Sequence, residues 1–434
     1  MKSDVVVVGG GATGVFTCLD LALRGIKVVL VERGGLGSGT SGKFHGMLHS
    51  GARYVVNDPA AAVECARENQ ILSRIAPHVI TDTGGLFVGI TEEDTEYRED
   101  LEAGCKKCEV PYEELAPEMA RCLEPKLNPL VKSAVRVSDK VIRAHDLIFC
   151  AALTASANGA KLHPYHEVTD FLRDDRKDIT GVKTYNSTRS RMEEFRSELI
   201  INAAGPWAGK LAQLAGVTVE VICFAGEMGV VPAKICSQVI NRMRQPSDGD
   251  IMIPYGDNYS IMGTTATVVD DPDELQLSEE DTNLLIDEGS EMFPILRSLG
   301  FQRTYASVRP LLKVGKGDEE DARKVSRIYD IFDHERDGVH GLVTVAGGKL
   351  TTCRLMGEQI GDIAAKKLGV KEPSRSKEVQ LLGSRTDERT QRTLETAGID
   401  RRLVKQIMDT VGTVDEERFM PAFRLLMSYA LSEE

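Results

Sequence analysis

The first 32 residues of this 434-residue chain contain the feature that most constrains its fold. The apolar run DVVVV at 4–8 leads into GGGATG at 9–14. An amphipathic stretch follows, and then a second apolar run, KVVLVE at 27–32. The spacing G-x-G-x-x-G, directly after a buried strand and at the start of a helix, is typical of a dinucleotide-binding β–α–β unit. We therefore predict a Rossmann-type nucleotide site at the start of the chain.

Each glycine of this turn has its own physical role. Gly9 permits the tight turn, Gly11 lets the backbone approach a pyrophosphate, and Gly14 lets the helix pack closely on the strand. The following N–H groups, from Ala12 and Thr13 onward, lie at the positive end of the helix dipole and favour an anion. These five residues form the first part of the predicted cofactor site.

The end of the second strand and a distant glycine turn narrow the choice of dinucleotide. Glu32 is placed to accept hydrogen bonds from the adenosine ribose hydroxyls, which disfavours NADP; Arg33 follows it. A second glycine turn, GGKLTT at 347–352, also starts a helix. Two helix N-termini directed at one dinucleotide suit FAD, whose reduced ring needs stabilisation of negative charge. The residues predicted in this second turn are Gly348, Lys349, Leu350 and Thr351.

Three strand–turn–helix units, at 4–25, 196–216 and 341–369, are widely separated along the chain. Insertions into one nucleotide-binding domain would spread its units in this way. We expect FAD-binding parts at 1–80, 145–215 and 335–370, cap insertions at 81–144 and 216–334, and a helical C-terminal region at 371–434.

Composition excludes several classes of protein. The net charge of −13 argues against a nucleic-acid binder. The start of the chain shows no leader pattern, and no apolar run approaches the length of a membrane span, so we expect a cytoplasmic protein. Nine scattered cysteines favour reduced thiols. The pair CKKC at 105–108 has redox spacing but lies in a charged stretch, which disfavours a thioredoxin-like role.

Hydrophobic periodicity also predicts several helices. They cover 55–76, with Asp58 and Pro59 at the start, the charged stretch 92–122, and AHDLIFCAALTASA. The apolar segment FMPAFRLLMSYAL at 419–431 has a helical period and leaves two interpretations open, core packing or docking of a membrane-anchoring partner.

The loop GTSGKFHGMLHSGARY at 39–54 contains two histidines with zinc-helix spacing. Position 46 between them is glycine rather than the glutamate of H-E-x-x-H, and the glycine-rich surroundings disfavour a helix. We therefore expect no metal site here.

Several ordered segments resemble the FAD-dependent sn-glycerol-3-phosphate dehydrogenases, most closely the catalytic A subunit of the anaerobic, quinone-linked form. The segments are DVVVVGGGATG, SGTSGKFHGMLHSGARY, GTT at 263–265, YASVRPL, VSRIYDIFDH and GGKLTTCRLMGE. The resemblance covers about residues 1–385 and implies an α/β fold. This fold is a glutathione-reductase-like (DAO-type) FAD-binding Rossmann domain with an inserted mixed-sheet substrate-binding cap domain and a short helical C-terminal tail.

The resemblance also implies a reaction and partners. The family transfers a hydride from C2 of glycerol 3-phosphate to flavin N5, which yields dihydroxyacetone phosphate, and passes electrons to a quinone pool at the membrane. For this chain it implies FAD, glycerol 3-phosphate, and an electron-transfer or membrane-anchor subunit, with peripheral membrane association through that partner. The sequence leaves a homodimer open.

Site residues follow from the matching motifs. The substrate-binding residues implied are Arg53, Tyr54, Tyr255, Arg309, Arg327 and Lys349. Guanidinium forks and a point charge suit a phosphate dianion, and nearby cations suit an alkoxide forming at C2. The remaining cofactor-binding residues implied are Thr40, Ser41, His49, Ser50, Gly51, Val168, Ala204, Gly205 and Trp207. Val168 is expected to contribute only its backbone.

Two departures from the family pattern leave questions open. Aerobic members carry a candidate basic histidine in G-S-H-I-V-V-P, where this chain has GEMGVVP at 226–232. The base is therefore His49 or Glu227, with Arg309 as the other catalytic residue. Longer anaerobic members add a cysteine-rich iron–sulfur domain, which we do not expect here because no cysteine follows Cys353.

Two other functions remain as alternatives. One is an FAD oxidase or dehydrogenase of another 2-hydroxy or 2-amino acid. The other is a flavin-binding subunit without turnover. A cluster of several cations favours a phosphorylated substrate over both.

Overall fold

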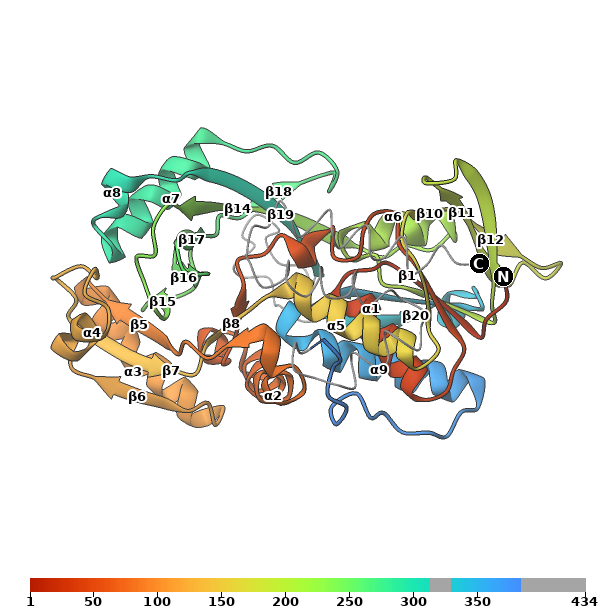
Figure 1. Cartoon of the computed structure of the whole chain (residues 1–434), viewed down its shortest axis with the longest axis horizontal. Coiled ribbons are helices and arrows are strands. Elements are labelled where there is room, and N and C mark those ends of the chain that lie inside the picture. The colour runs from red at the N-terminus through yellow and green to blue at the C-terminus, as the bar shows by residue number, and fades with distance from the viewer. Residues whose placement is uncertain (313–328, 384–434) are drawn as a thin grey trace, which may run out of the picture.

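In the computed structural model, which describes residues 1–312 and 329–383, two β-sheets lie beside each other along the long axis of the molecule (Figure 1). Among these residues the first sheet has six strands in the order β20-β21-β13-β1-β2-β9. Only β20 runs antiparallel to its neighbour. The strands are β1 (Val5–Val8), β2 (Val28–Val31), β9 (Lys161–His163), β13 (Leu199–Asn202), β20 (Tyr329–Asp333) and β21 (Leu342–Gly347).

The first sheet is covered on both faces, which explains why β1, β2 and β13 are buried at every residue and are apolar except for Asn202 at the end of β13. One face packs against three helices that contact one another through α1: α1 (Ala12–Leu23), α5 (Ala144–Ala157) and α9 (Cys353–Leu368). The other face packs against a three-stranded sheet and a short helix: β10 (His166–Arg173), β11 (Ile179–Asn186), β12 (Arg191–Arg196) and α6 (Ala208–Leu214).

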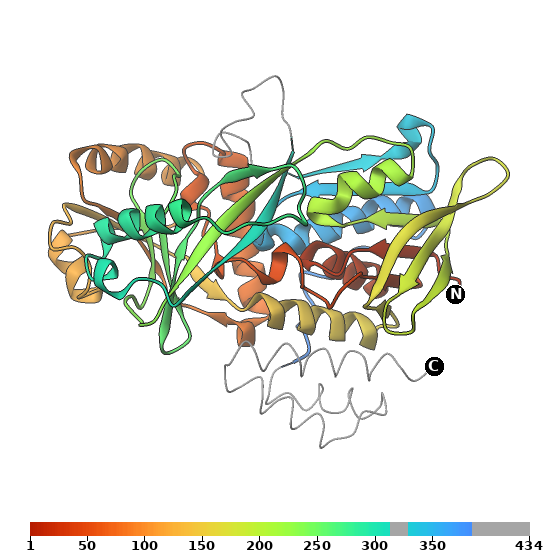
Figure 2. The same ribbon diagram turned by 90° about the horizontal axis from the view of Figure 1, so that it is seen from above.

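The second sheet has the strand order β18-β14-β17-β16-β15-β5-β7-β6, and β19 pairs with β14. Its strands are β5 (Gly85–Gly89), β6 (Tyr112–Leu115), β7 (Ser133–Val137), β14 (Val221–Val231), β15 (Val239–Arg242), β16 (Ile251–Tyr255), β17 (Tyr259–Gly263), β18 (Thr267–Val269) and β19 (Arg303–Leu312). Its helices are α3 (Glu92–Lys107), α4 (Pro117–Leu123), α7 (Glu279–Met292) and α8 (Leu296–Leu299). The long strands β14 and β19 run from this sheet toward the first one, where β19 contacts β21 (Figure 2).

The two inserted segments of the chain share this second sheet. Strand β5, from the first insertion, pairs in parallel with β15, from the second, with Gly85–Val88 opposite Val239–Arg242. The insertions expected at 81–144 and 216–334 therefore combine in one sheet. Strand β20 instead pairs with β21 in the first sheet, so the expected boundary at 334 falls after this strand rather than before it.

A small third sheet and helix α2 lie between the two large sheets. The sheet consists of β3 (Met47–Leu48), β8 (Lys140–Ile142) and β4 (Ile80–Thr81). Helix α2 (Pro59–Ile75) begins as predicted, with Asp58 accepting a hydrogen bond from the N–H of Ala61. Short 3₁₀ turns connect these elements: η1 (Thr40–Gly42), η2 (Ala52–Tyr54), η3 (Pro77–Val79), η4 (Gly205–Trp207), η5 (His334–Asp337) and η6 (Leu350–Thr352).

In two of the predicted helical regions the structure does not show the expected continuous helix. The stretch 92–122 is not one helix: α3 ends after Lys107, and β6 separates it from α4. The left-handed Glu109 (φ 55°) helps to turn the chain at this point. The predicted C-terminal helical region shows no helix over 371–383, and residues 384–434, which include the apolar segment 419–431, lie outside the described residues. No helix within the described ranges combines the length and apolar character needed to cross a bilayer.

Candidate active site

Three glycine-containing turns meet at the carboxyl ends of parallel strands in the first sheet. They follow β1 at 9–14, β13 at 203–205 and β21 at 347–349, and all three line one pocket of about 1460 Å³. Ligands of open α/β sheets bind at this edge. The pocket exceeds the roughly 300–1,000 Å³ of a typical small-molecule site, so it has room for a dinucleotide together with a substrate.

Two glycines of the first turn, Gly9 and Gly14, cannot be replaced without collision. A Cβ on Gly14 would lie 2.0 Å from the carbonyl oxygen of Gly9, and a Cβ on Gly9 would lie 2.5 Å from the carbonyl oxygen of Ala203. Gly9 also has φ +112°. The turn is thus packed against the helix behind it and the β13 turn beside it, and Gly11 faces the pocket.

Glu32 at the end of β2 holds the turn in place. Its Oε2 accepts a hydrogen bond from the N–H of Gly10 at 2.6 Å, and its Oε1 accepts one from the N–H of Gly34 at 2.8 Å. A carboxylate has about four lone-pair sites, so each oxygen retains capacity for a ribose hydroxyl. The side chain lines the pocket, as its predicted role requires.

Arg33, Trp207 and Asp273 form a cluster beside the turn. The Arg33 guanidinium lies 4.1 Å from the centroid of the Trp207 ring, and its Nη2 lies 2.7 Å from Asp273. Trp207 Nε1 donates a hydrogen bond to the same carboxylate at 2.9 Å. Because all three line the pocket, this cluster brings the 270–275 loop to the edge of the nucleotide site.

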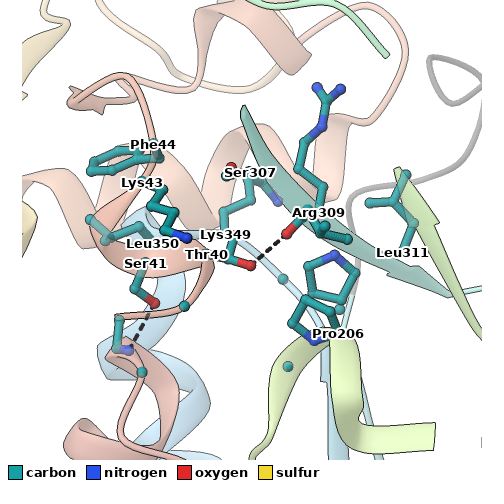
Figure 3. Close-up of a pocket in the computed structure, with 18 of the residues that line it drawn as sticks. Thr40, Ser41, Lys43, Phe44, Pro206, Ser307, Arg309, Leu311, Lys349 and Leu350 are labelled. Atoms are coloured by element: carbon teal, nitrogen blue, oxygen red, sulfur yellow. Dashed lines mark hydrogen bonds between the residues drawn. The ribbon is translucent and has the colours of Figure 1, made fainter. Parts of the chain in front are cut away.

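The loop at 39–54 begins beside β19, where Figure 3 shows Thr40 next to Arg309. The Thr40 hydroxyl donates to the carbonyl oxygen of Val308 on β19, and Ser41 Oγ accepts from the N–H of Ala12 at 3.0 Å. Asn69 of α2 donates from Nδ2 to the carbonyl oxygens of Leu48 and His49, at 3.2 and 3.1 Å. Contacts with α1, α2 and β19 therefore determine the path of the loop.

Arg53 lies between the pocket and a buried carboxylate. Its Nη2 is 3.1 Å from Asp250 Oδ2, and Asp250, which is fully buried, also accepts from Arg244 Nε at 2.8 Å. Burial raises the pKa of Asp250, and the positive charges of Arg53 and Arg244 oppose that shift. The buried Nη1 of Arg53 has no hydrogen-bond partner among the described residues. A donor of this kind beside the pocket suits an anionic ligand.

Arg309 on β19 extends along the neighbouring strand. Its Nη1 donates to Thr264 Oγ1 at 3.1 Å, and its Nη2 donates to the carbonyl oxygen of Thr265. A Cβ on Gly226 would lie 3.0 Å from Nη2, so β14 needs glycine there to leave space for the guanidinium. Lys349 approaches from the third turn, with Nζ 5.0 Å from the centroid of the Tyr54 ring.

Most of the predicted site residues line this pocket. They are Gly9, Gly11, Ala12, Thr13, Glu32, Arg33, Thr40, Ser41, His49, Arg53, Tyr54, Val168, Ala204, Gly205, Trp207, Arg309, Gly348, Lys349, Leu350 and Thr351. Gly14 lies behind the turn, as its packing role requires. Arg327 falls in 313–328, outside the described residues.

Besides Gly14, three predicted residues do not line the pocket. The N–H of Ser50 donates to buried Asp139 at 2.7 Å, and Gly51 has its Cα turned toward the carbonyl of Ala62 in α2. Tyr255 ends β16 without reaching the pocket lining. Ser50 and Gly51 therefore support the loop from behind.

Glu227, the other candidate base, does not line the pocket. Side chains alternate along β14, and Gly226 and Met228 face the pocket whereas Glu227 faces α7. Its carboxylate is buried and accepts hydrogen bonds from the N–H of Ser278 at 3.1 Å and from the Thr282 hydroxyl. It cannot take a proton from a ligand in the pocket in this arrangement.

The histidine loop and the cysteine pair have no metal or thioredoxin-like geometry. Residues 45–49 contain β3 rather than a helix, in agreement with the prediction, and Gly46 there has φ +96°. No group of three or more potential metal ligands occurs in 1–312 and 329–383. All nine cysteines are free thiols, and burial raises the pKa of Cys105 to about 12, which keeps this thiol protonated.

Sequence reasoning missed His45, Asp250 and Ser307 as site residues, although His45 and Ser307 line the pocket and Asp250 holds Arg53. The signal for Asp250 was an aspartate in the loop DGD directly before an apolar strand. Such an aspartate can be recognised as part of the site only when the structure shows the arginine beside it.

Comparison with known proteins defines the class of this fold and site. Residues 4–354 match the family of FAD dependent oxidoreductases, and the chain belongs to this family. The residues fit the cofactor, because three glycine turns frame a pocket with room for a dinucleotide, and Gly9 and Gly14 leave no space for a Cβ.

Curated relatives place the chain more finely within this family. It is 38% identical over 386 residues to the A subunit of the anaerobic glycerol-3-phosphate dehydrogenase of Escherichia coli strain K12, covering 88% of this chain and 70% of the relative. It is 39% identical over 391 residues to the A1 subunit of the anaerobic glycerol-3-phosphate dehydrogenase of Haloferax volcanii, covering 88% and 66%. The chain therefore spans about two thirds of the length of these relatives.

Solved structures agree with the fold. The glycerol-3-phosphate dehydrogenase of Bacillus halodurans complexed with FAD superimposes with a TM-score of 0.70 at 24% identity, covering 100% of this chain and 78% of the other. Glycine oxidase from Geobacillus kaustophilus gives a TM-score of 0.67 at 21% identity, covering 84% and 95%. The predicted fold class is thus confirmed.

The collision at Gly14 leads to a prediction about FAD retention. Gly14→Ala would force apart the turn and α1, because the new Cβ has only 2.0 Å to the carbonyl oxygen of Gly9. We expect the variant to lose about 1–3 kcal/mol of stability and to be purified with little FAD. The flavin-to-protein absorbance ratio after gel filtration measures this, and a full complement of FAD at wild-type stability would contradict it.

Proposed function

We propose that the chain oxidises sn-glycerol 3-phosphate at C2 to dihydroxyacetone phosphate, with FAD as the immediate acceptor. The observation that carries this proposal is the set of three cationic side chains, Arg53, Arg309 and Lys349, on the same pocket as the FAD-type glycine turns. A phosphate dianion needs several positive charges, whereas a substrate carboxylate is satisfied by one arginine fork. The relatives named as glycerol-3-phosphate dehydrogenases support the same choice.

Each cation has a proposed role. Arg53, fixed on one side by Asp250, directs its remaining buried N–H groups at the phosphate, and Lys349 supplies a second charge from the third turn. Arg309, held by Thr264 and Thr265, stabilises the negative charge that grows on the C2 oxygen. FAD, when bound, supplies the acceptor for the two electrons and the hydrogen that leave C2.

The hydroxyl proton also needs an acceptor. His49 lines the pocket, and its Nε2 lies 3.5 Å from the Tyr54 hydroxyl. With Glu227 directed at α7, we assign proton removal to His49. The third turn holds the main chain of His49, because Thr351 Oγ1 accepts from the N–H of His49 at 3.3 Å.

The test is anaerobic mixing of the FAD-loaded protein with glycerol 3-phosphate. We expect loss of the oxidised flavin band near about 450 nm, a general flavin property. Glycine, lactate and 2-hydroxyglutarate are the matched alternatives, because they carry a carboxylate in place of the phosphate. Reduction by one of these instead would favour an oxidase or dehydrogenase of another 2-hydroxy or 2-amino acid, and no reduction by any of them would favour a flavin-binding subunit without turnover.

We further propose that electrons pass from FAD to quinone through a partner subunit that holds the chain at the membrane. The relatives are named as the A subunit of an anaerobic dehydrogenase, which supports an assembly of more than one chain. Affinity purification of the chain from its own membranes should recover quinone reductase activity together with a second subunit. Recovery of the chain alone, as a monomer or homodimer that reduces quinone directly, would contradict this part of the proposal.

The contact between Asp250 and Arg53 leads to a prediction on substrate affinity. Asp250→Asn removes the buried charge that holds Arg53, so we expect KM for glycerol 3-phosphate to rise about 10-fold while kcat changes less than about 3-fold. The matched control is Asp257→Asn, at an exposed turn of the same hairpin. A fall in kcat with unchanged KM would show that Asp250 does not act through phosphate binding.

A further inference from the structure

His45 lines the pocket that also holds the predicted phosphate site at Arg53 and the predicted C2 site at Arg309. Its ring lines the pocket together with Arg53 and Arg309. The Phe44 ring lies 5.5 Å away and the His49 ring 6.3 Å away, centroid to centroid. The side chain is partly buried, and its exposed part opens on the pocket.

The loop determines which ring nitrogen of His45 carries a proton. The N–H of Met47 donates a hydrogen bond to His45 Nδ1 at 3.1 Å. A backbone N–H can only donate, so Nδ1 is the acceptor, and the neutral ring carries its proton on Nε2. Gly46, with φ +96°, makes the tight turn that brings this N–H back to the ring.

The charges around His45 oppose its protonation. Burial, and then the positive charges of Arg53 and Arg309, lower the pKa of His45 to about 3. His49 also faces the ring, and Asp250 lies beyond Arg53 as its counter-ion. The imidazole therefore stays neutral at physiological pH, with its Nε2–H directed away from the Met47 contact.

We propose that His45 is a neutral hydrogen-bond donor, through Nε2–H, to an oxygen of the phosphorylated substrate, and that it does not act as the base. This inference rests on the proposed function. Nδ1 is already occupied and Nε2 already carries a proton, so the ring has no free site to take the C2 hydroxyl proton. A neutral donor adds a directed contact to the two guanidinium groups without adding a third buried charge.

Two substitutions separate the donor role from a base role. His45→Gln keeps an N–H donor near the place of Nε2 but cannot exchange a proton, and His45→Phe keeps the volume without the donor. In anaerobic flavin reduction by glycerol 3-phosphate, we expect kcat/KM of His45→Phe to fall about 10- to 150-fold and that of His45→Gln to stay within about 5-fold of wild type. FAD content should be unchanged in both.

The pH profile and the tautomer provide further tests. Any acidic limb in the kcat/KM profile of the wild type should persist in His45→Gln, and ¹⁵N NMR of histidine-labelled holoenzyme should show a neutral Nε2–H ring for His45 down to about pH 5. Equal losses in the two variants, loss of the acidic limb in His45→Gln, wild-type kinetics in His45→Phe, or an Nδ1–H ring would each overturn the inference. If glycerol 3-phosphate does not reduce the wild type, the proposed function fails, and NMR still tests the tautomer.

Discussion

Replacement of Arg309 by leucine is expected to slow flavin reduction by glycerol 3-phosphate about 10²- to 10³-fold while FAD stays bound. Arg309 is the cation assigned to the C2 oxygen, where negative charge grows as hydrogen leaves. Its guanidinium is positioned by hydrogen bonds to Thr264 and Thr265. Stopped-flow spectroscopy of the anaerobic holoenzyme measures the rate.

Two further variants make the Arg309 result specific. Arg303→Leu changes an exposed arginine at the start of the same strand and should leave the rate unchanged. Gly226→Ala places a Cβ 3.0 Å from Arg309 Nη2 and should lower the rate by displacing the guanidinium. Unimpaired reduction in Arg309→Leu would show that another group stabilises the C2 oxygen.

Replacement of Arg354 by leucine is expected to lower the free energy of unfolding by roughly 3–5 kcal/mol. Arg354 of α9 forms a two-pronged ion pair with Glu68 of α2, at 2.7 and 2.6 Å, and both side chains are fully buried. It also donates to Ser376 at 3.0 Å and to Glu358. Without the arginine, Glu68 remains as an uncompensated buried charge in α2, the helix whose Asn69 holds the loop at 39–54.

Urea unfolding of the holoenzyme measures this loss. Arg336→Leu, at an exposed position, is the control and should change stability by less than about 0.5 kcal/mol. The double variant Arg354→Leu/Glu68→Leu should recover much of the loss, because an apolar pair can replace a buried ion pair at little cost. A double variant as unstable as the single one would show that packing, and not the unpaired carboxylate, dominates.

Local sequence patterns were sufficient to predict the turns of the nucleotide-binding half of the molecule. The G-x-G-x-x-G turn and Glu32 depend largely on backbone conformation and on contacts between residues close in sequence, such as Gly14 with Gly9 and Glu32 with Gly10, and the third turn at 347–352 has its own glycine pattern. The start of α2 at Pro59 was predictable for the same reason, because Asp58 caps a helix whose first residues follow it.

The substrate half of the site could not be predicted in the same way, because it depends on contacts between residues that are far apart in the sequence. Glu227 and Gly226 are adjacent in sequence, but strand alternation places one against α7 and the other on the pocket. The pairing of Arg53 with Asp250 joins positions 197 residues apart. The segment 92–122 is divided into α3, β6 and α4 because β6 pairs with β7. Helical propensity along the sequence cannot predict this pairing.

The sequence by itself therefore determined the fold family, the cofactor turns and three cations that line the pocket, Arg53, Arg309 and Lys349, because these follow from short-range backbone requirements and from ordered motifs. Only the tertiary structure decided which carboxylate supports Arg53, that Glu227 points away, and which nitrogen of His45 carries the proton. Burial, charge and hydrogen-bond direction arise when distant segments pack together, and they give chemically identical side chains different roles.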